Sequence, residues 1–276
     1  MTESHRPFES PVHPHKSHKN HSLPRNFRNR YPFRLSAPSF IWPDTWAANA
    51  RLLAPAVDEV ELLLFESREL PDEAEIRELE KIRRDTGLGY NVHLPTDVSL
   101  ADPAGWESAA KTLRTAIERT APLEPSVFVL HLPAPDFPGG EDWRNAARRG
   151  LEDLLSTGIP ARCFAVETPE DGPFAPVLPL VEAFDLSICL DTGHLLLRAE
   201  NPVVFLETHR DRIAAIHLHG IADGKDHQPL NRFPAMLAAD FAEALRSFRG
   251  VLSLEVFGYD ALVESLDTLA EWLPEE

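Results

Sequence analysis

The amino-acid sequence predicts a single-domain α/β fold, a (β/α)8 TIM barrel, and three observations support this prediction. Eight short apolar runs rich in Val, Ile, Leu and Phe lie between residues 33 and 256, as expected of strands buried on both faces. Amphipathic stretches separate these runs, and alternation of strand and helix is typical of a parallel sheet. Eight such units in about 240 residues favour a closed barrel. An open doubly wound sheet is the alternative, but no Gly-x-Gly-x-x-Gly pattern follows the first run.

The eight runs and the stretches between them give the expected elements. The predicted strands are 33–40, 60–65, 90–94, 127–132, 162–167, 186–191, 213–218 and 251–256. The clearest helical stretches are 71–87, 103–120, 142–158 and 233–248. Several of them begin after Asp or Pro and end at Gly, which are the usual start and stop signals of helices.

The first thirty-one residues differ in composition from the rest of the chain. Seven of the 27 Lys and Arg residues, but only two of the 44 Asp and Glu residues, lie within 1–34. This stretch also holds five of the twelve histidines, and it has few apolar residues. Such a segment buries too little surface to fold, so we predict a disordered, basic, His-rich tail over 1–31 and a barrel over 32–276. His-rich tracts bind metal ions loosely, and the segment lacks the apolar stretch of a secretory signal.

Composition and charge exclude several classes of function. A formal net charge of −17 opposes generic binding to nucleic-acid phosphates, so we expect no nucleic-acid partner. No apolar run of about 18 residues is present, so we expect no membrane span. Two cysteines, Cys163 and Cys189, are too few for a disulfide framework and suit a reducing compartment, which favours a cytoplasmic location.

Six of the predicted strands share one register at their C-terminal ends. Each carries an ionisable residue there, a large aliphatic residue one position earlier and, in most cases, a small residue two positions earlier. Side chains alternate across a strand, so the aliphatic residues should face the helices, with the ionisable and small residues facing the barrel interior. The ionisable residues are His93, His131, Glu167, Asp191, His217 and Glu255.

These six residues predict a metal site, because active sites of such barrels lie at the C-terminal ends of the strands. One buried His or acid is often structural, but six in a shared register are not explained in that way. Clustered carboxylates in a low dielectric do not all stay ionised without cations. Mixed His and carboxylate sets suit Zn, Mn or Fe as divalent ions, whereas Mg²⁺ and Ca²⁺ prefer oxygen ligands. The identity and number of the metals stay open.

Further polar residues follow these strands in the loops. His194 comes three residues after Asp191 and can reach the same mouth, and Asp226 and His227 come from the loop after the seventh strand. His219 lies two residues after His217, on the same side of its strand, and is a possible further ligand. Glu66, at the end of the second strand, is a weaker possibility that a surface position explains equally well.

Together these motifs resemble the xylose isomerase-like barrel superfamily, which includes the endonuclease IV nucleases and sugar-phosphate isomerases and epimerases. YNVHLP and FVLHLP are similar to the two histidine strand ends of the nuclease branch, and FAVET, CLDTGH, IHLHG and LSLEV to its metal strands. The resemblance covers nearly all of 33–273. It implies that metal ligands or substrate contacts are His93, His131, Glu167, Asp191, His194, His217 and Glu255.

Within the superfamily, the stretches FIWP, VELLLFES, YNVHLPTD, LDTGHLLL and IHLHGIADGKDH are most similar to the bacterial cobamide-remodelling phosphodiesterases. This resemblance implies hydrolysis of the nucleotide-loop phosphodiester of a corrinoid cobamide, giving cobinamide phosphate and an α-riboside. The chain departs from the nuclease branch in three ways. His219 stands where that branch has Asn, adjacent Asp226 and His227 replace its Asp-x-His pair, and a Gly-Glu-Gly turn is absent.

Two enzymatic mechanisms are compatible with these residues. In a phosphodiesterase, Glu167 and Glu255 ligate metal or steer water, and Asp226, His227 or His194 orients the phosphate or protonates the leaving oxygen. In the alternative, a sugar phosphate isomerase or epimerase, one metal holds the sugar or sugar phosphate while the two glutamates shuttle a proton. The additional histidines at the ends of strands three and four favour the phosphodiesterase. A non-enzymatic corrinoid- or metal-binding module is the third possibility.

Overall fold

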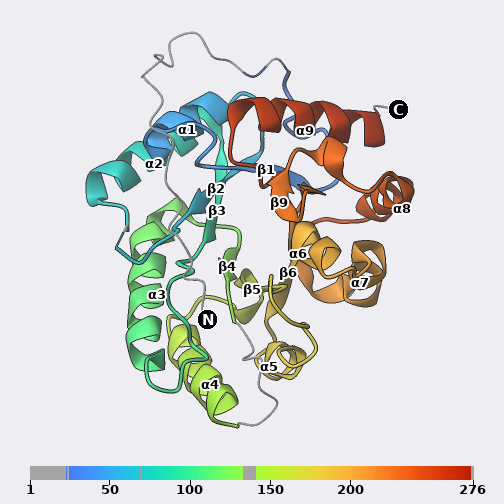
Figure 1. The fold of residues 1–276 in the computed structure, drawn as a ribbon. Coiled ribbons are helices and arrows are strands. Elements are labelled where there is room, and N and C mark those ends of the chain that lie inside the picture. The colour runs from blue at the N-terminus through green and yellow to red at the C-terminus, as the bar shows by residue number, and fades with distance from the viewer. Residues whose placement is uncertain (1–22, 24, 69, 133–140, 275–276) are drawn as a thin grey trace.

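The structure is a computed structural model that describes residues 23, 25–68, 70–132 and 141–274. Its strands form one closed barrel in the order β1-β10-β7-β6-β5-β4-β3-β2, and every neighbouring pair runs parallel. Helices surround the barrel on its outer side (Figure 1). The predicted (β/α)8 barrel is therefore confirmed.

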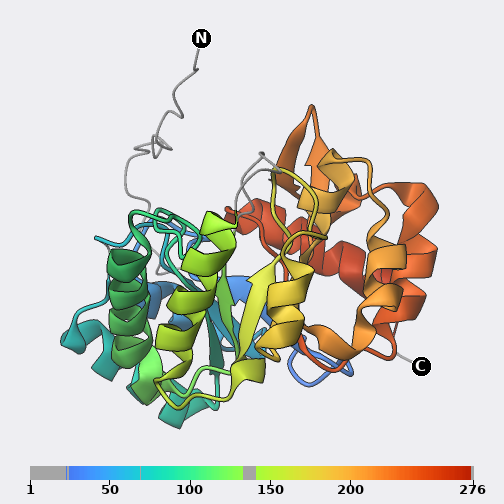
Figure 2. The same ribbon diagram turned by 90° about the horizontal axis from the view of Figure 1, so that it is seen from below.

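The elements keep close to the predicted ranges. The barrel strands are β1 (Arg34–Pro38), β2 (Glu59–Leu63), β3 (Gly89–His93), β4 (Phe128–Leu130), β5 (Phe164–Glu167), β6 (Ser187–Asp191), β7 (Ile213–His217) and β10 (Val251–Ser253). The helices are α1 (Trp46–Leu53), α2 (Glu73–Thr86), α3 (Trp106–Thr120), α4 (Asp142–Leu155), α5 (Leu178–Ala183), α6 (Thr192–Leu197), α7 (Pro202–Thr208), α8 (Ala235–Leu245) and α9 (Tyr259–Trp272). In Figure 2, α3 and α4 in green lie across the barrel from α8 and α9 in orange and red.

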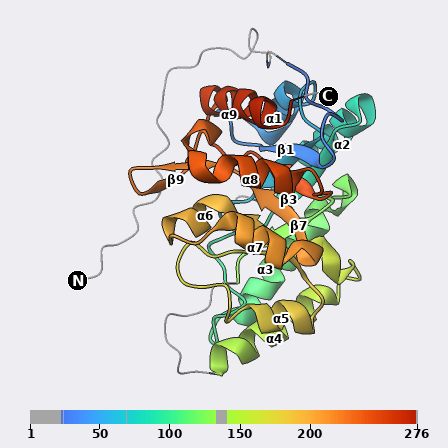
Figure 3. The same ribbon diagram turned by 90° about the vertical axis from the view of Figure 1, so that its right-hand side faces the viewer.

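One hairpin departs from the simple strand–helix alternation. After β7 the chain forms the antiparallel pair β8 (Gly220–Ala222) and β9 (Lys225–Gln228), which is separate from the barrel sheet. Figure 3 shows this hairpin extending away from the barrel beside α6. The loop that was expected to carry Asp226 and His227 is therefore a β-hairpin.

The two faces of the strands separate as their sequence pattern predicted. The aliphatic residues one position before the ionisable ones all belong to the large core between strands and helices: Val92, Leu130, Val166, Leu190, Ile216 and Leu254. A second, smaller cluster fills part of the barrel interior with Val127, Val129, Ala165, Cys189, Ala215 and Val251. The aliphatic residues thus face the helices, and the ionisable residue that follows each of them faces the barrel interior.

The other part of the barrel interior is polar. Buried Ser36, Glu59, Glu61, Asn91 and Ser253 come from β1, β2, β3 and β10, which are neighbours in the sheet. Asn91 Nδ2 donates to Ser36 Oγ at 2.9 Å and to Glu59 Oε2 at 3.3 Å. Burial raises the pKa of Glu59, although Arg34 beside it acts in the opposite direction. The interior is thus divided into an apolar arc over β4 to β7 and a polar arc over β1 to β3, and β10 between them contributes Val251 to the first and Ser253 to the second.

Two residues of the predicted N-terminal tail contact the barrel. Residues 1–22 of the predicted tail lie outside the described residues, but Phe27 is only 1% exposed within the core. The Arg28 guanidinium donates to the carbonyl oxygens of Ala54, Thr86 and Gly87, at the C-terminal ends of α1 and α2. Helix ends leave carbonyls without intrahelical partners, and Arg28 satisfies three of them. Phe27 and Arg28 therefore contact the barrel from the tail side of the boundary predicted after residue 31.

Two expectations from composition concern membranes and thiols. Within the described ranges, no helix is both long and apolar enough to cross a membrane. Cys163 and Cys189 are both free, and Cys189 is buried in the barrel interior. Burial raises the pKa of the Cys189 thiol, as expected of a packing residue.

Candidate metal centre

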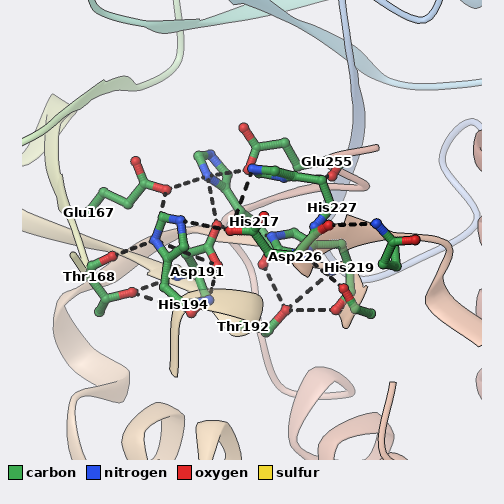
Figure 4. A network of polar contacts seen from close by, with 12 residues as sticks. Glu167, Thr168, Asp191, Thr192, His194, His217, His219, Asp226, His227 and Glu255 are labelled. Atoms are coloured by element: carbon green, nitrogen blue, oxygen red, sulfur yellow. Dashed lines mark hydrogen bonds and ion pairs between the residues drawn. The ribbon is translucent and has the colours of Figure 1, made fainter. Parts of the chain in front are cut away.

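The predicted ionisable residues meet at the C-terminal end of the barrel. His93, Glu167, Asp191 and His217 are the last residues of their strands, and Glu255 follows β10 by two residues. These five are buried, whereas the side chain of His131, one residue beyond β4, is 35% exposed. Figure 4 shows Glu167, Asp191, His217 and Glu255 pointing toward one another from separate strands.

Glu167 lies at the centre of a group of histidines. Its Oε2 is 3.1 Å from Nε2 of His93 and 2.5 Å from Nε2 of His131, and its Oε1 is 3.0 Å from Nδ1 of His217. Burial alone would raise the pKa of Glu167, but the charges and hydrogen bonds of His131 and His217 hold it well below its usual value. Glu167 is therefore an ionised carboxylate near neutral pH.

His217 is surrounded by carboxylates on both ring nitrogens. Its Nδ1 lies 3.0 Å from Glu255 Oε2 and 3.8 Å from Asp191 Oδ2, in addition to the contact with Glu167. Its Nε2 lies 2.9 Å from Oε1 of Glu61, a fully buried residue of β2. Burial alone would lower the pKa of His217, but the acidic groups around it hold the pKa well above its usual value.

Hydrogen bonds fix the orientation of three imidazoles. Nδ1 of His93 lies 3.0 Å from the carbonyl of Leu94, and Nδ1 of His194 lies 2.8 Å from the carbonyl of Thr168. A carbonyl only accepts, so these nitrogens carry the proton, and the β2 carboxylate fixes Nε2 of His217 in the same way. The opposite nitrogen of each ring then directs its lone pair at a carboxylate. That arrangement is repulsive unless a second proton or a metal cation lies between them.

The donor set therefore fits divalent metal ions. Single donor atoms of Glu167, Asp191, His217 and Glu255 all lie within 4.8 Å of one another. Glu255 Oε2 is buried and makes no hydrogen bond despite its 3.0 Å distance from His217 Nδ1, as expected of an oxygen directed at a cation. Other groups within the same limit are His93–Glu167–His217, His194–Asp226–His227 and His219–His227–Glu255. The cluster offers donors for more than one ion.

The spacing of Asp191 and His194 has a local structural cause. Asp191 is the N-cap of α6, and its Oδ1 accepts a hydrogen bond from the backbone N–H of His194 at 2.8 Å. Burial would raise the pKa of Asp191, but the charges of His194 and His219 lower it. Burial opposes charge on His194 as well, yet Asp191 and Glu167 raise its pKa to about 9.

His219 is engaged at both ring nitrogens. The backbone N–H of His227 donates to its Nδ1 at 2.9 Å, so Nε2 carries the proton and donates to Asp191 Oδ2 at 3.1 Å. Gly193 faces the ring so closely that a Cβ atom there would overlap it. These contacts show that His219 holds Asp191, and the same residue also belongs to the donor group His219–His227–Glu255, so its role as a further ligand stays a prediction.

The β8–β9 hairpin brings the adjacent pair Asp226 and His227 to the centre. Asp226 Oδ2 lies 3.5 Å from His194 Nε2, and His227 Nδ1 lies 3.8 Å from Glu255 Oε2. Adjacent residues of a regular strand point to opposite faces. His227 has a left-handed φ of 51°, which breaks this alternation and lets both side chains reach the site.

Strand β2 contributes a different residue from the one expected. Glu66 lies outside the cluster, with its side chain 38% exposed and 2.5 Å from Arg68. The residue of β2 that reaches the cluster is Glu61, which was not among the predicted site residues. Its signal was the alternation of Glu59 and Glu61 with aliphatic residues, because the same pattern marks the interior face of the other strands.

A pocket of about 450 Å³ opens above the donor cluster. Its donor-bearing lining residues are His93, His131, Glu167, His194, His227 and Glu255. Its apolar lining includes Leu63, Phe65, Leu132 and Phe257. A small molecule that enters the mouth of the barrel can therefore reach these donor residues.

The sequence profile of a known family matches residues 54–276, and the family is described as "Xylose isomerase-like TIM barrel". This chain belongs to that family. No match is found among curated protein sequences. This match confirms the superfamily predicted from the strand-end motifs. It does not distinguish the cobamide-remodelling subfamily from the others.

Solved structures similar to this xylose isomerase-like barrel include enzymes of different reaction types. A D-tagatose 3-epimerase-like protein is 20% identical with a TM-score of 0.74, over 87% of this chain and 97% of that one. Endonuclease IV from Thermus thermophilus is 21% identical with a TM-score of 0.66, over 88% and 100%. The 3-keto-D-glucoside 4-epimerase from E. coli is 18% identical with a TM-score of 0.66, over 87% and 98%. At these identities the likeness is one of fold.

Proposed function

We propose that this barrel is a divalent-metal-dependent isomerase or epimerase of a sugar or sugar phosphate. The observation that carries the proposal is the pair of buried glutamates, Glu167 at the end of β5 and Glu255 just beyond β10, which both approach Nδ1 of His217 at 3.0 Å. With Asp191 they form one compact four-donor group under an open pocket. Neighbours whose names state sugar epimerisation at C3 or C4 support this choice.

The chemistry follows from the charges of these residues. A divalent cation held by Glu167, Asp191, His217 and Glu255 supplies Lewis acidity toward adjacent substrate oxygens. Burial would raise the pKa of Glu255, but His217 and His227 lower it to about 2, so it is an ionised carboxylate at neutral pH. Glu167 and Glu255 come from separate strands and can accept a proton from a substrate carbon and return it. His194, with Nε2 free of a backbone acceptor, can bind a substrate hydroxyl.

The second candidate is a phosphodiesterase acting on a corrinoid cobamide. It is favoured by the donors that a one-metal epimerase leaves unused: His93 and His131 around Glu167, and the group His194–Asp226–His227. Additional donors of this kind suit a centre with more than one cation, and such centres stabilise both the attacking and the leaving oxygen of a phosphodiester. Sequence motifs support this candidate, whereas the solved neighbours include several epimerases as well as endonuclease IV.

One product assay distinguishes the two candidates. The Mn²⁺- or Zn²⁺-supplemented protein is incubated separately with a cobamide and with a panel of ketoses, ketose phosphates and 3-keto-glycosides, and the products are identified by mass spectrometry and NMR. Epimerised sugar with intact cobamide supports the main proposal. Release of an α-riboside and cobinamide phosphate, with all sugars unchanged, overturns it in favour of the second candidate.

Replacement of Glu167 tests the site itself. We expect Glu167→Gln to abolish turnover, because it removes the charge that four imidazoles surround, while thermal unfolding stays cooperative. Turnover at the wild-type rate by a correctly folded Glu167→Gln variant would remove Glu167 from the site in either mechanism.

A further inference from the structure

Phe65 and Phe257 line one side of the pocket, and Phe40 packs against Phe65; these three residues are called here the aromatic wall. Phe65 contacts Phe40 edge-on with ring centroids 5.7 Å apart and Phe257 with centroids 5.8 Å apart. Phe257 in turn packs on the ring of His227 at 4.6 Å. The wall therefore begins at the metal-donor cluster and leads away from it.

The position of the wall follows from the order of the strands. Phe40 and Phe65 lie two residues beyond the ends of β1 and β2, and Phe257 lies four residues beyond the end of β10. β10, β1 and β2 are neighbours in the barrel. The rim therefore carries its aromatic rings over β10, β1 and β2 and most of its donors over β3 to β7, and the two sets meet after β10, where Glu255 precedes Phe257 by two residues.

Phe65 is exposed in a way that requires explanation. Its relative exposure is 38%, and in the described part of the chain the other large hydrophobic residues so exposed are Val204 and Met236, on the surface helices α7 and α8. Phe65, by contrast, lines the pocket above the donors. An exposed aromatic ring next to convergent polar groups is typical of a ligand contact.

The charge of the pocket limits what the ligand carries. Among the described residues that line it, none is Lys or Arg. The rim opposite the wall carries the exposed acids Glu170 and Asp171. A phosphomonoester that extends away from the metals would need cationic side chains or a helix N-terminus to hold it. The part of the ligand that lies against the wall is therefore not a phosphate or another anionic group.

We propose that the aromatic wall binds a flat, uncharged aryl or heteroaryl group that is joined to the sugar whose oxygens reach the donor cluster. The substrate is thus a sugar with a planar aglycone rather than a free sugar phosphate. This inference rests on the proposed function only in taking the donor cluster as the reactive end of the pocket. Offset or edge-on contact with Phe65 and Phe257 supplies the binding, because aromatic rings prefer these geometries.

Equilibrium binding tests the proposal without any assumption about turnover. The probes are the phenyl and methyl β-D-glucopyranosides and the phenyl and methyl β-D-ribofuranosides, titrated by calorimetry into full-length protein loaded with Mn²⁺. For at least one sugar, we expect the phenyl glycoside to bind about tenfold more tightly than its methyl partner, the range typical of stacking on an aromatic side chain. Equal binding of both members of each pair, or binding of neither, overturns the proposal.

Variants locate the effect. Phe65→Ala should remove most of the phenyl preference and leave Mn²⁺ affinity unchanged, whereas Met236→Ala, which removes a side chain 84% exposed on α8, should preserve the preference. A preference that survives in Phe65→Ala places the aryl group elsewhere and contradicts the proposal. If chelator-treated protein binds glucose 6-phosphate more tightly than the phenyl glycosides, the proposal is also contradicted. If the phenyl preference holds while the ketose and cobamide assays both fail, the aromatic wall stands and the proposed reactions do not.

Discussion

Two glutamates of β2, separated by one residue, have different surroundings. Glu59 accepts hydrogen bonds from Arg34, Ser126 and Asn91 near the N-terminal end of the barrel. Glu61 lies closer to the metal centre, with one oxygen on His217 Nε2 and the other buried without a hydrogen bond. A carboxylate on the far nitrogen of a metal-binding histidine fixes its tautomer and increases its basicity. Glu61 is thus suited to orient His217.

Glu61→Gln should lower divalent-metal affinity by about tenfold to a hundredfold, because the substitution keeps the side-chain shape and removes the charge that faces His217 Nε2. Zn²⁺ affinity is measured by competition with a chromophoric chelator, in full-length protein whose five tail histidines are replaced by Asn to remove loose binding. Glu59→Gln is the matched control, since it alters the same side chain on the same strand without contact to a metal donor. Equal loss of affinity in both variants would contradict the orienting role.

At the scale of elements, the site depends on how α6 meets the β8–β9 hairpin. Asp191 caps α6, so the first turn of the helix aims His194 at the hairpin, which supplies Asp226. Gly193 lies at this contact. A Cβ atom at this position would overlap the ring of His219 and would lie 3.0 Å from Cβ of Asp226. The absence of a side chain at Gly193 permits the two elements to approach.

Gly193→Ala should separate α6 from the hairpin and weaken metal binding, at a cost in unfolding free energy of about 1–3 kcal/mol, as for other overpacked sites. Gly150→Ala in α4 serves as the control, because its new Cβ would meet Leu100 Cδ2 at 2.8 Å, far from the donors. Both variants are compared by chemical denaturation and by metal titration. Metal affinity that falls equally in the two variants would indicate a general loss of stability rather than a local effect.

For the whole molecule, the buried charges of the donor cluster link stability to pH. Burial opposes charge on His93, His194 and His217, but without metal the neighbouring carboxylates raise the pKa of all three, that of His194 from 6.5 to about 9. A raised histidine pKa stabilises the fold fully below pH 6.5 and loses this effect as pH rises through about 9. The pKa of Glu255 is lowered to about 2, so its ionised form stabilises the fold above pH 4.5. This stabilisation is lost as the pH falls from 4.5 through about 2.

Metal-free protein should therefore lose stability between pH 6.5 and 9, by about 3 kcal/mol from His194 alone. Metal-loaded protein should lose much less, because a bound cation replaces the protons on the imidazoles and its affinity increases as they are released. Thermal unfolding of chelator-treated and Zn²⁺-loaded samples across this range checks the difference. If the metal-free form keeps or gains stability from pH 6.5 to 9, protonated histidines do not stabilise the donor cluster.

The sequence predicts those parts of the site that repeat from strand to strand. The alternation of aliphatic, small and ionisable residues placed His93, Glu167 and His217 on the interior face because that periodicity is local. Glu61 does not follow the register of the other strand ends, because Leu63 is paired with His93 and the acid of β2 lies one interior position deeper. The joint reach of Asp226 and His227 depends on a left-handed φ, which strand periodicity does not encode.

Closure of the barrel has a consequence for the order of folding. Arg34 of the first strand pairs with Val251 of the last, and Glu255 follows directly after that strand. Contacts between such distant parts of a chain form slowly, because closing a long loop costs entropy before the contact contributes. The four-donor group is therefore complete only once the final strand has docked. In refolding experiments, tight metal binding should therefore appear later than the recovery of the helical circular-dichroism signal.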